Sequence, residues 1–311
     1  MDKKKHLLNE LLKTSIINQG MFYTVNILTE YKKAISDPDT SVGKIASIIE
    51  KDPGLTSAAL KTANSSFYGY SKSVNTVKQA ISVLGYKTLE RVLLTQAMNT
   101  SFLSQSLPFM NDLWKHSLTT AIAAHQISAL KNPLLAEQAF IAGLLHDLGK
   151  FLLITFKKEG MESLFKELEK NTHQYTFVLE QDIFGIDHQE IGEFFAKQWL
   201  FPDNVSNTIR FHHSFTGNAG ILPANNDNIA GKMPAFPVET DLSDIDREMI
   251  STIAIANNIA KAMEFGKSTS SLVECLPHSL YQNIDFKPDD FERIVYTTKN
   301  KFYELTSLME D

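Results

Sequence analysis

The sequence of 311 residues lacks several features that mark particular classes of protein. It holds one cysteine, Cys275, which excludes an internal disulfide framework and a zinc site made of cysteines. No stretch approaches about eighteen uninterrupted apolar residues, so we expect no segment that spans a bilayer. The sequence has no internal repeat and no low-complexity tract, and the alternation of apolar and polar residues that is typical of strands is hard to find.

Positive charge is also scarce. Lysine and arginine number 30 against 36 aspartates and glutamates, which gives a formal net charge of −6. Such a chain does not attract phosphate backbones or anionic membranes as a whole, and it has no clustered basic recognition helix. The N-terminus resembles an amphipathic helix rather than a signal peptide. We therefore expect a cytoplasmic protein without a membrane or nucleic-acid partner.

Helical periodicity is what the sequence does contain. Hydrophobic residues make up 43% and charged residues 21%, which are ordinary values for a globular chain. Asp52 followed by Pro53 has the residue types of a helix N-cap and first turn, and we expect that helix to stop near Asn64. Gly85 closes a further apolar stripe that begins at Val77. We predict an all-α fold.

Breaker residues divide the chain. Pro108 and Asn111 lie where the helices become longer and more apolar. We therefore predict an N-terminal helical subdomain over 1–108 and a second helical subdomain over 109–311. Residues 216–243 are rich in Gly, Pro and Asn and predict a long loop, and loops of that length are usually functional or mobile.

The most distinctive local segment is GLLHDLGK, residues 143–150. Asp147 follows Phe140 and Leu144 at helical spacing, which points it toward the core. A buried charge needs a partner or a cation. An isolated His-Asp pair is more often satisfied by backbone or a nearby basic side chain than by a metal, so His146 and Asp147 alone do not decide the chemistry.

Further histidines favour a metal site. His116, His188 and His212 are expected on inward faces of three other helices, with His213 beside His212. Imidazole and carboxylate together suit Fe, Mn, Ni or Zn, as one ion or two. A carboxylate between two sets of histidines also suits a pair of metals that activates water against a phosphate ester. Periodicity alone prefers His125 to His116 as the inward residue, whereas the remaining histidines lie in polar surroundings: His6, His173 and His278.

These motifs resemble the HD superfamily of metal-dependent phosphohydrolases. More closely, the chain resembles the HDOD (HD-related output domain) family over roughly residues 15–265. The resemblance rests on six segments: residues 48–69, 77–92, 113–117, 139–150, 187–202 and 209–213. It implies an HD-like helical bundle behind an N-terminal helical subdomain, and a role in bacterial signal transduction. The context LWKHS favours His116 over His125 as the family's histidine.

Two departures from the superfamily pattern bear on activity. Asn257 stands where the superfamily usually has an aspartate, and an amide is a poorer ligand for a divalent cation. The Gly-Tyr-Pro continuation that the HD-GYP phosphodiesterases carry after the paired histidines is missing after His213. The resemblance therefore implies a degenerate site that is not catalytic.

Two functions follow from the resemblance. The first is a signalling or output module that acts through signalling proteins or a bound ligand. The alternative is a metal-dependent phosphohydrolase or phosphodiesterase for a nucleotide or cyclic dinucleotide. In either case Asp147 would bind or bridge metal, with His116 and His146 on one side. The other side would be formed by His188 and His212, assisted by His213, and Asn257 would be a weak neighbour of the ion. If the site were active, the catalytic residues would be Asp147 and Lys150, although we expect the Lys150 side chain to be solvated rather than to bind an anion.

Overall fold

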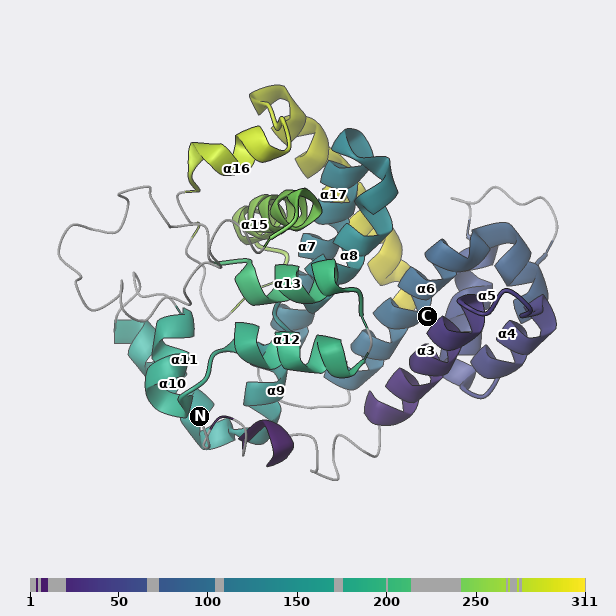
Figure 1. The fold of residues 1–311 in the computed structure, drawn as a ribbon, viewed down its shortest axis with the longest axis horizontal. Coiled ribbons are helices and arrows are strands. Elements are labelled where there is room, and N and C mark those ends of the chain that lie inside the picture. Colours follow the sequence, from purple (N-terminus) through teal and green to yellow (C-terminus); the bar gives the residue numbers. More distant parts are fainter. Residues whose placement is uncertain are drawn as a thin grey trace. The chain divides into compact units, whose positions relative to one another are not determined.

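The chain folds as a set of α-helices (Figure 1), which confirms the predicted fold class. The computed structural model describes residues 4, 7–10, 21–65, 73–103, 109–170, 176–199, 201–213, 242–266, 268, 273 and 276–310. These residues contain no strand. The helices are α3 (Met21–Ile35), α4 (Val42–Ile49), α5 (Pro53–Asn64), α6 (Val77–Leu103), α7 (Met110–Lys131), the 3-10 helix η2 (Pro133–Leu135), α8 (Ala136–Leu145), α9 (Leu148–Phe156), α10 (Lys158–Lys170), α11 (Thr176–Phe184), α12 (His188–Gln198), α13 (Asp203–Phe211), α15 (Asp244–Met263), α16 (His278–Asn283) and α17 (Pro288–Glu310).

The helices belong to two compact units. The larger unit comprises Met1–Leu11 and Ser106–Asn300, and the smaller unit comprises Leu12–Gln105 and Lys301–Asp311. This division differs from the predicted 1–108 and 109–311 at both chain ends. A change of composition along the sequence reports where helices change character, but it does not report with which unit a terminal segment packs.

The smaller unit forms as its caps and breakers predict. Asp52 accepts a hydrogen bond from the backbone N–H of Leu55 and caps α5, with Pro53 in the first turn. Asn64 ends α5, and its amide both donates to the carbonyl and accepts from the N–H of Val74. Helix α6 is interrupted at Gly85, whose φ of 72° is open to glycine at no steric cost. Helices α3, α4 and α5 pack on α6 around an apolar core.

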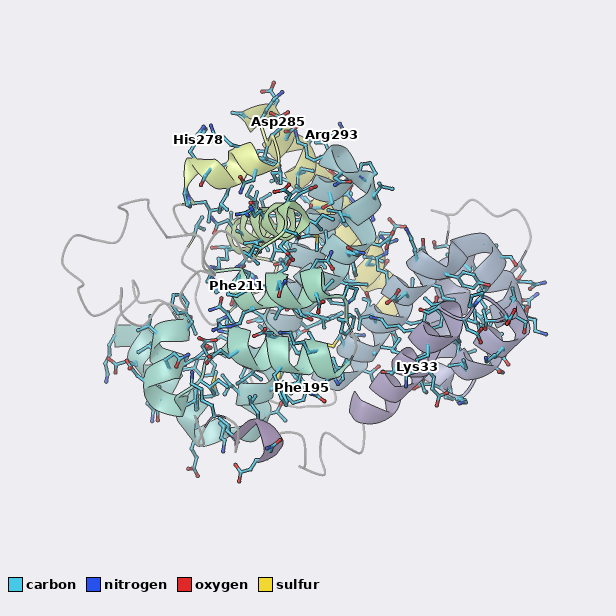
Figure 2. All side chains as sticks on the ribbon, in the orientation of Figure 1. Lys33, Phe195, Phe211, His278, Asp285 and Arg293 are labelled. Atoms are coloured by element: carbon cyan, nitrogen blue, oxygen red, sulfur yellow. The ribbon has the colours of Figure 1, made fainter. Side chains whose placement is uncertain are left out.

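The larger unit has an apolar core of its own. Helix α7 packs against α8 and α15, and α12 runs beside α13 (Figure 1). Helix α12 buries an apolar face, with Ile191 and Phe195 fully buried; Phe195 is labelled in Figure 2. The stretch Pro133–Thr155 is long and apolar enough to cross a membrane by length and composition, and 89% of its most apolar 18-residue window is buried inside the protein, as in a core segment.

The His-Asp pair departs from its predicted setting. Instead of lying inside one helix, His146 and Asp147 form the turn between the end of α8 at Leu145 and the start of α9 at Leu148. Adjacent residues of a continuous helix point about 100° apart. The turn instead allows both side chains to enter the core, where each is at most 1% exposed.

Candidate metal centre

The five histidines of the predicted site meet around one carboxylate in the larger unit. His116 comes from α7, His188 opens α12, and His212 with His213 follows the end of α13. The side chains of His116, His188 and His212 are fully buried, and that of Asp147 is 1% exposed. The paired helices that bring them together are α7 with α8, α9 with α12, α12 with α13, and α13 with α8.

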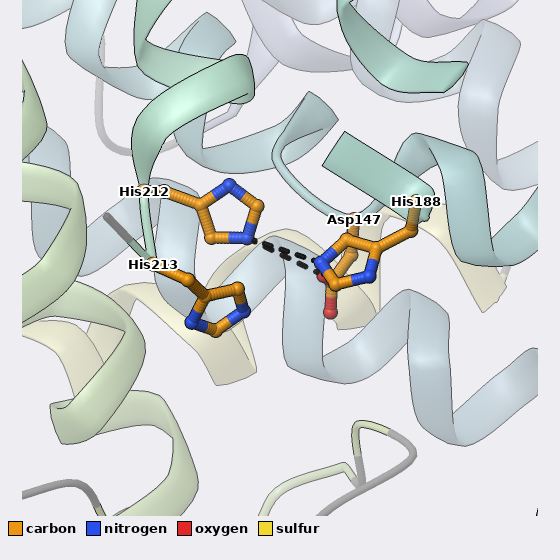
Figure 3. A group of neighbouring side chains, drawn as sticks. All are labelled: Asp147, His188, His212 and His213. Atoms are coloured by element: carbon orange, nitrogen blue, oxygen red, sulfur yellow. Dashed lines mark hydrogen bonds and ion pairs between the residues drawn. The ribbon is translucent and has the colours of Figure 1, made fainter. Parts of the chain in front are cut away.

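Two groups of candidate ligands share Asp147. The His188 group comprises Asp147, His188, His212 and His213, and the His116 group comprises Asp147, His116 and His146; within each, the candidate ligand atoms lie within 4.8 Å of one another. Oδ1 of Asp147 is 3.5 Å from Nε2 of His188 and 3.8 Å from Nε2 of His212 (Figure 3). Oδ2 is 3.4 Å from Nε2 of His146 and 3.8 Å from Nε2 of His116. Each oxygen thus faces one group.

In three of the histidines, Nδ1 already forms a hydrogen bond with an oxygen atom outside the cluster of candidate ligands. Nδ1 of His146 lies 2.7 Å from the carbonyl of Gly143, and Nδ1 of His212 lies 2.8 Å from the carbonyl of Ile209. Nδ1 of His188 lies 2.5 Å from a carboxylate oxygen of Glu180. Carbonyl and carboxylate oxygens only accept, so Nδ1 carries the hydrogen and Nε2 of each neutral ring presents a lone pair. Such outer partners are typical of metal-binding imidazoles.

Nε2 lone pairs that face each other without a donor between them fit a cation. Nε2 of His188 and Nε2 of His212 are 3.4 Å apart. Two nitrogens held tetrahedrally about 2.1 Å from one ion would be about 3.4 Å apart. In the His116 group, three ring nitrogens have no hydrogen-bond partner among the described residues: Nδ1 and Nε2 of His116, and Nε2 of His146. Buried, unsatisfied acceptors of this kind are costly unless an ion binds them.

Burial and the charges of neighbouring groups keep the histidines and Asp147 in the protonation states that bind metal. Burial, followed by the charges of neighbouring histidines or of Lys150, lowers the pKa of His116, His188 and His212 well below the usual histidine range. Burial also lowers the pKa of His146 to about 4. Burial opposes ionisation of Asp147, but the nearby histidines and Lys150 together hold its pKa well below the usual value. The rings are therefore neutral and the carboxyl is ionised near neutral pH.

Lys150 is buried at this centre, so the expectation that its side chain is solvated is wrong. Its Nζ lies 2.8 Å from Oδ1 and 2.9 Å from Oδ2 of Asp147, and the residue is 3% exposed. Lys150 also donates to Oγ of Ser268 at 2.8 Å, and Ser268 donates to Oδ2 of Asp147 at 3.0 Å. Lys150 lies one turn after Asp147 at the start of α9, which directs both side chains to the same face.

Glu180 contacts the centre, although the sequence patterns did not predict it. It lies on α11, is fully buried, and one of its oxygens accepts from both the backbone N–H and Nδ1 of His188. Burial raises the pKa of Glu180 to about 7. The signal in the sequence is an acidic residue directly after the buried apolar run Phe177–Leu179, eight positions before His188. Ser268 had no such signal, because 121 residues separate it from Asp147.

Asn257 lies on α15, which packs against α7. Its side chain is buried, and its Oδ1 has no hydrogen-bond partner among the described residues. Lys261 follows one turn later on the same face of α15, and its charge contributes to the lowered pKa of His116. This face of α15 therefore carries an ammonium whose charge acts on His116, and a buried amide one turn before it.

One glycine permits the close approach that joins the Asp147 turn to His188. A Cβ added to Gly149 would lie 2.0 Å from the carbonyl oxygen of His188, well inside van der Waals contact. Only a residue without a side chain lets the start of α9 and the start of α12 come this close. The backbone at these two helix starts thereby sets the distance between Asp147 and His188.

The other histidines lie apart from the centre. His125, expected in the core, is 15% exposed, and its Nε2 lies 3.5 Å from a carboxylate oxygen of Glu137. The preference for His116 over His125 as the residue near Asp147 therefore agrees with the geometry. His278 is exposed on α16 (Figure 2), as expected. His6, His173 and the predicted loop up to residue 241 lie outside the described residues.

Comparison with known proteins places these features in a family. The HDOD domain model matches residues 23–215. An uncharacterized protein of Treponema pallidum is 30% identical over 233 residues, which are 74% of this chain and 40% of that protein. The chain thus spans less than half the length of this curated relative.

Two solved structures share the fold. An HDOD domain protein from Geobacter sulfurreducens matches with a TM-score of 0.67 and 22% identity, over 92% of this chain and 91% of that one. A candidate metal-dependent phosphohydrolase from Shewanella amazonensis matches with a TM-score of 0.55 and 17% identity, over 97% and 100%. The predicted HD-like helical bundle with a preceding helical subdomain is therefore confirmed, and the chain belongs to the HDOD family.

Proposed function

We propose that the chain is a signalling or output module whose buried histidine-aspartate centre binds a divalent transition metal and does not turn over a substrate. The metal, of the class Fe, Mn, Ni or Zn, would hold the helix ends around Asp147 in one arrangement. Signalling proteins would read that arrangement, in a bacterial cytoplasm. The chain's own residues would bind and orient the ion through the Nε2 atoms and Asp147.

The observation that carries this proposal is the state of the Asp147 carboxylate. It is the carboxylate shared by both groups of candidate ligands, and Lys150 already forms an ion pair with both of its oxygens. A bound metal would supply a polarised water and charge stabilisation for phosphate-ester hydrolysis. A carboxylate neutralised by a buried ammonium contributes less negative charge to hold a pair of metals for that purpose, and Asn257 adds none.

A metal-dependent phosphohydrolase or phosphodiesterase for a nucleotide or cyclic dinucleotide is the second candidate. Imidazole nitrogens on two sides of one carboxylate favour it, as does the fold shared with the Shewanella amazonensis candidate phosphohydrolase. In that case Lys150, buried beside Asp147, would be positioned to hold an anionic oxygen of the substrate. Charge-assisted bonds of this kind are among the stronger ones in proteins.

A turnover assay separates the two candidates. The full chain is incubated with a generic phosphodiester, nucleotides and cyclic dinucleotides in the presence of Mn²⁺ or Fe²⁺. We expect hydrolysis no faster than in a matched Asp147→Asn sample, because the signalling role requires binding alone. Robust hydrolysis by the unaltered chain that disappears in Asp147→Asn would sink the proposal and establish the enzyme.

A further inference from the structure

We propose that the centre binds a single metal ion, in the His188 group, and that the ammonium of Lys150 takes the place of a second ion. This inference rests on the proposed metal binding and specifies where and how the ion is held. It differs from a two-metal centre, in which both groups would be filled, and from an ion held by His116 and His146.

The two oxygens of Asp147 are not equally available. Oδ2 accepts from both Lys150 and Ser268, at 2.9 and 3.0 Å. Oδ1 lies 2.8 Å from Nζ of Lys150 but has no hydrogen-bond partner among the described residues. A carboxylate oxygen has about two lone-pair sites, so those of Oδ2 are filled while Oδ1 retains at least one. The retained lone pair belongs to the oxygen nearer to His188 and His212.

The candidate ligands of the His188 group are also better preorganised for binding an ion than those of the His116 group. Glu180 fixes the tautomer of His188, and the carbonyl of Ile209 fixes that of His212, so both Nε2 lone pairs converge at 3.4 Å. In the His116 group the carbonyl of Gly143 fixes His146, whereas no hydrogen bond among the described residues fixes either nitrogen of His116. Preorganised ligands lose less conformational freedom when an ion binds.

The charges near the two groups also favour an ion in the His188 group. Glu180 places a second carboxylate against His188. Lys150 lies within 2.9 Å of both oxygens of Asp147, so its charge acts on both groups. A divalent ion is attracted most strongly where the carboxylates of Asp147 and Glu180 both lie close to it, which is beside His188. This attraction favours occupancy of the His188 group.

Metal counting tests the inference on the unaltered chain. Protein stripped with a chelator is titrated with Mn²⁺ or Co²⁺, and bound metal is measured by elemental analysis after desalting. We expect one equivalent, with no metal–metal scattering in the X-ray absorption spectrum. Two equivalents with a second ion about 3.5–4 Å away would overturn the single-ion inference and leave metal binding intact. No bound ion at all would overturn the proposed metal binding itself.

A matched pair of variants locates the ion. His188→Gln is expected to weaken Co²⁺ binding at least 100-fold, whereas His116→Gln is expected to change it less than about threefold. Circular dichroism and thermal unfolding establish that each variant folds. Loss of binding in His116→Gln with retention in His188→Gln would place the ion in the other group. The metal count on the unaltered chain stands if either variant fails to fold.

The role of Lys150 has its own test. Lys150→Gln removes the ammonium but keeps a hydrogen-bond donor beside Asp147. We expect this variant to bind a second, weaker equivalent of Co²⁺, and the added change His116→Gln to abolish that second equivalent. If the Lys150→Gln variant is folded and still binds only one equivalent of Co²⁺, the inference that the ammonium takes the place of a second ion is wrong.

Discussion

The two units differ in what they bury. The buried polar residues of the smaller unit, among those described, are two threonines and one asparagine: Thr62, Thr95 and Asn99. The larger unit buries five histidines, Asp147, Lys150 and Glu180 within one core. Burying ionisable groups is costly unless they pair with one another or with a ligand. The larger unit therefore gives up stability to bring these groups together, whereas the smaller unit, among its described residues, buries no such cluster.

The substitution Gly149→Ala, in the larger unit, is expected to have the largest effect on stability and metal binding. The added methyl group would lie 2.0 Å from the carbonyl of His188, so the starts of α9 and α12 must separate. We expect a loss of about 3 kcal/mol or more in the free energy of unfolding, together with loss of metal binding. Denaturant unfolding and metal titration measure both.

The matched control is Gly85→Ala in the smaller unit. Gly85 has a φ of 72° but nothing within 4 Å of the added carbon, so backbone strain alone should cost about 1–3 kcal/mol. Metal binding should be unchanged. A Gly149→Ala variant as stable as the unaltered chain would show that the observed approach of the two helix starts is wrong.

Acid should destabilise the metal-free chain through the larger unit. The pKa of His146 is about 4 in the folded protein against 6.5 for an ordinary histidine, so the unfolded chain binds more protons between these values. Stability is therefore lost as the pH falls from about 6.5 toward 4, on the order of 3 kcal/mol from His146 alone. The lowered pKa values of His116, His188 and His212 act in the same direction.

Glu180 acts in the opposite direction. Its pKa is raised to about 7, so its contribution to stability is present below about 4.5 and is lost as the pH rises through 7. Four histidines outweigh one glutamate, and we expect the melting temperature in EDTA to fall between pH 7 and pH 4.5. A melting temperature that rises over this range would contradict neutral, buried histidines.

Glu180→Gln should weaken the centre without dismantling it. The amide can still contact Nδ1 of His188, but it removes the negative charge that holds the ring in the tautomer with a free Nε2. Loss of such an outer partner typically lowers metal affinity 10- to 100-fold. Isothermal titration with Mn²⁺ measures the change, with Glu190→Gln as the control on a partly exposed residue of α12. Equal Mn²⁺ affinities in Glu180→Gln and Glu190→Gln would show that Glu180 does not support metal binding.

The smallest expected effect is Asp52→Ala in the smaller unit. It removes the cap on the N–H of Leu55 and should cost about 1 kcal/mol of stability. Metal affinity should stay the same, because Asp52 belongs to the unit that does not hold the histidine-aspartate centre. A change in metal affinity would show that the units are more strongly coupled than their separate cores suggest.

Local signals in the sequence predict the smaller unit well. The cap at Asp52, the stop at Asn64 and the break at Gly85 are properties of one or two adjacent residues, and the structure has all three. Helical spacing also predicts inward positions for His188 and His212, but it prefers His125 to His116, and the choice of His116 rests on the resemblance of the segment LWKHS to the family. Glycine, proline and capping residues act over a few positions, and therefore they can be read from a single sequence.

The rest of the centre depends on contacts between distant parts of the chain. Lys150 pairs with Asp147 within one turn but also donates to the distant Ser268, and the tautomer of His188 is fixed by Glu180 on another helix. The break between α8 and α9 at His146 and Asp147 has no strong breaker residue, so periodicity continued through it. These features are set by tertiary packing, which no spacing rule along the chain reports.

X-ray absorption of the zinc-loaded chain tests the central claim most directly. We predict a shell of nitrogen and oxygen ligands at about 2.0–2.2 Å, with the outer scattering of at least two imidazole rings. Asp147→Asn, measured in parallel, should retain far less zinc. A spectrum of oxygen ligands without imidazole scattering, or equal zinc content in the variant, would contradict a metal held by these histidines and Asp147.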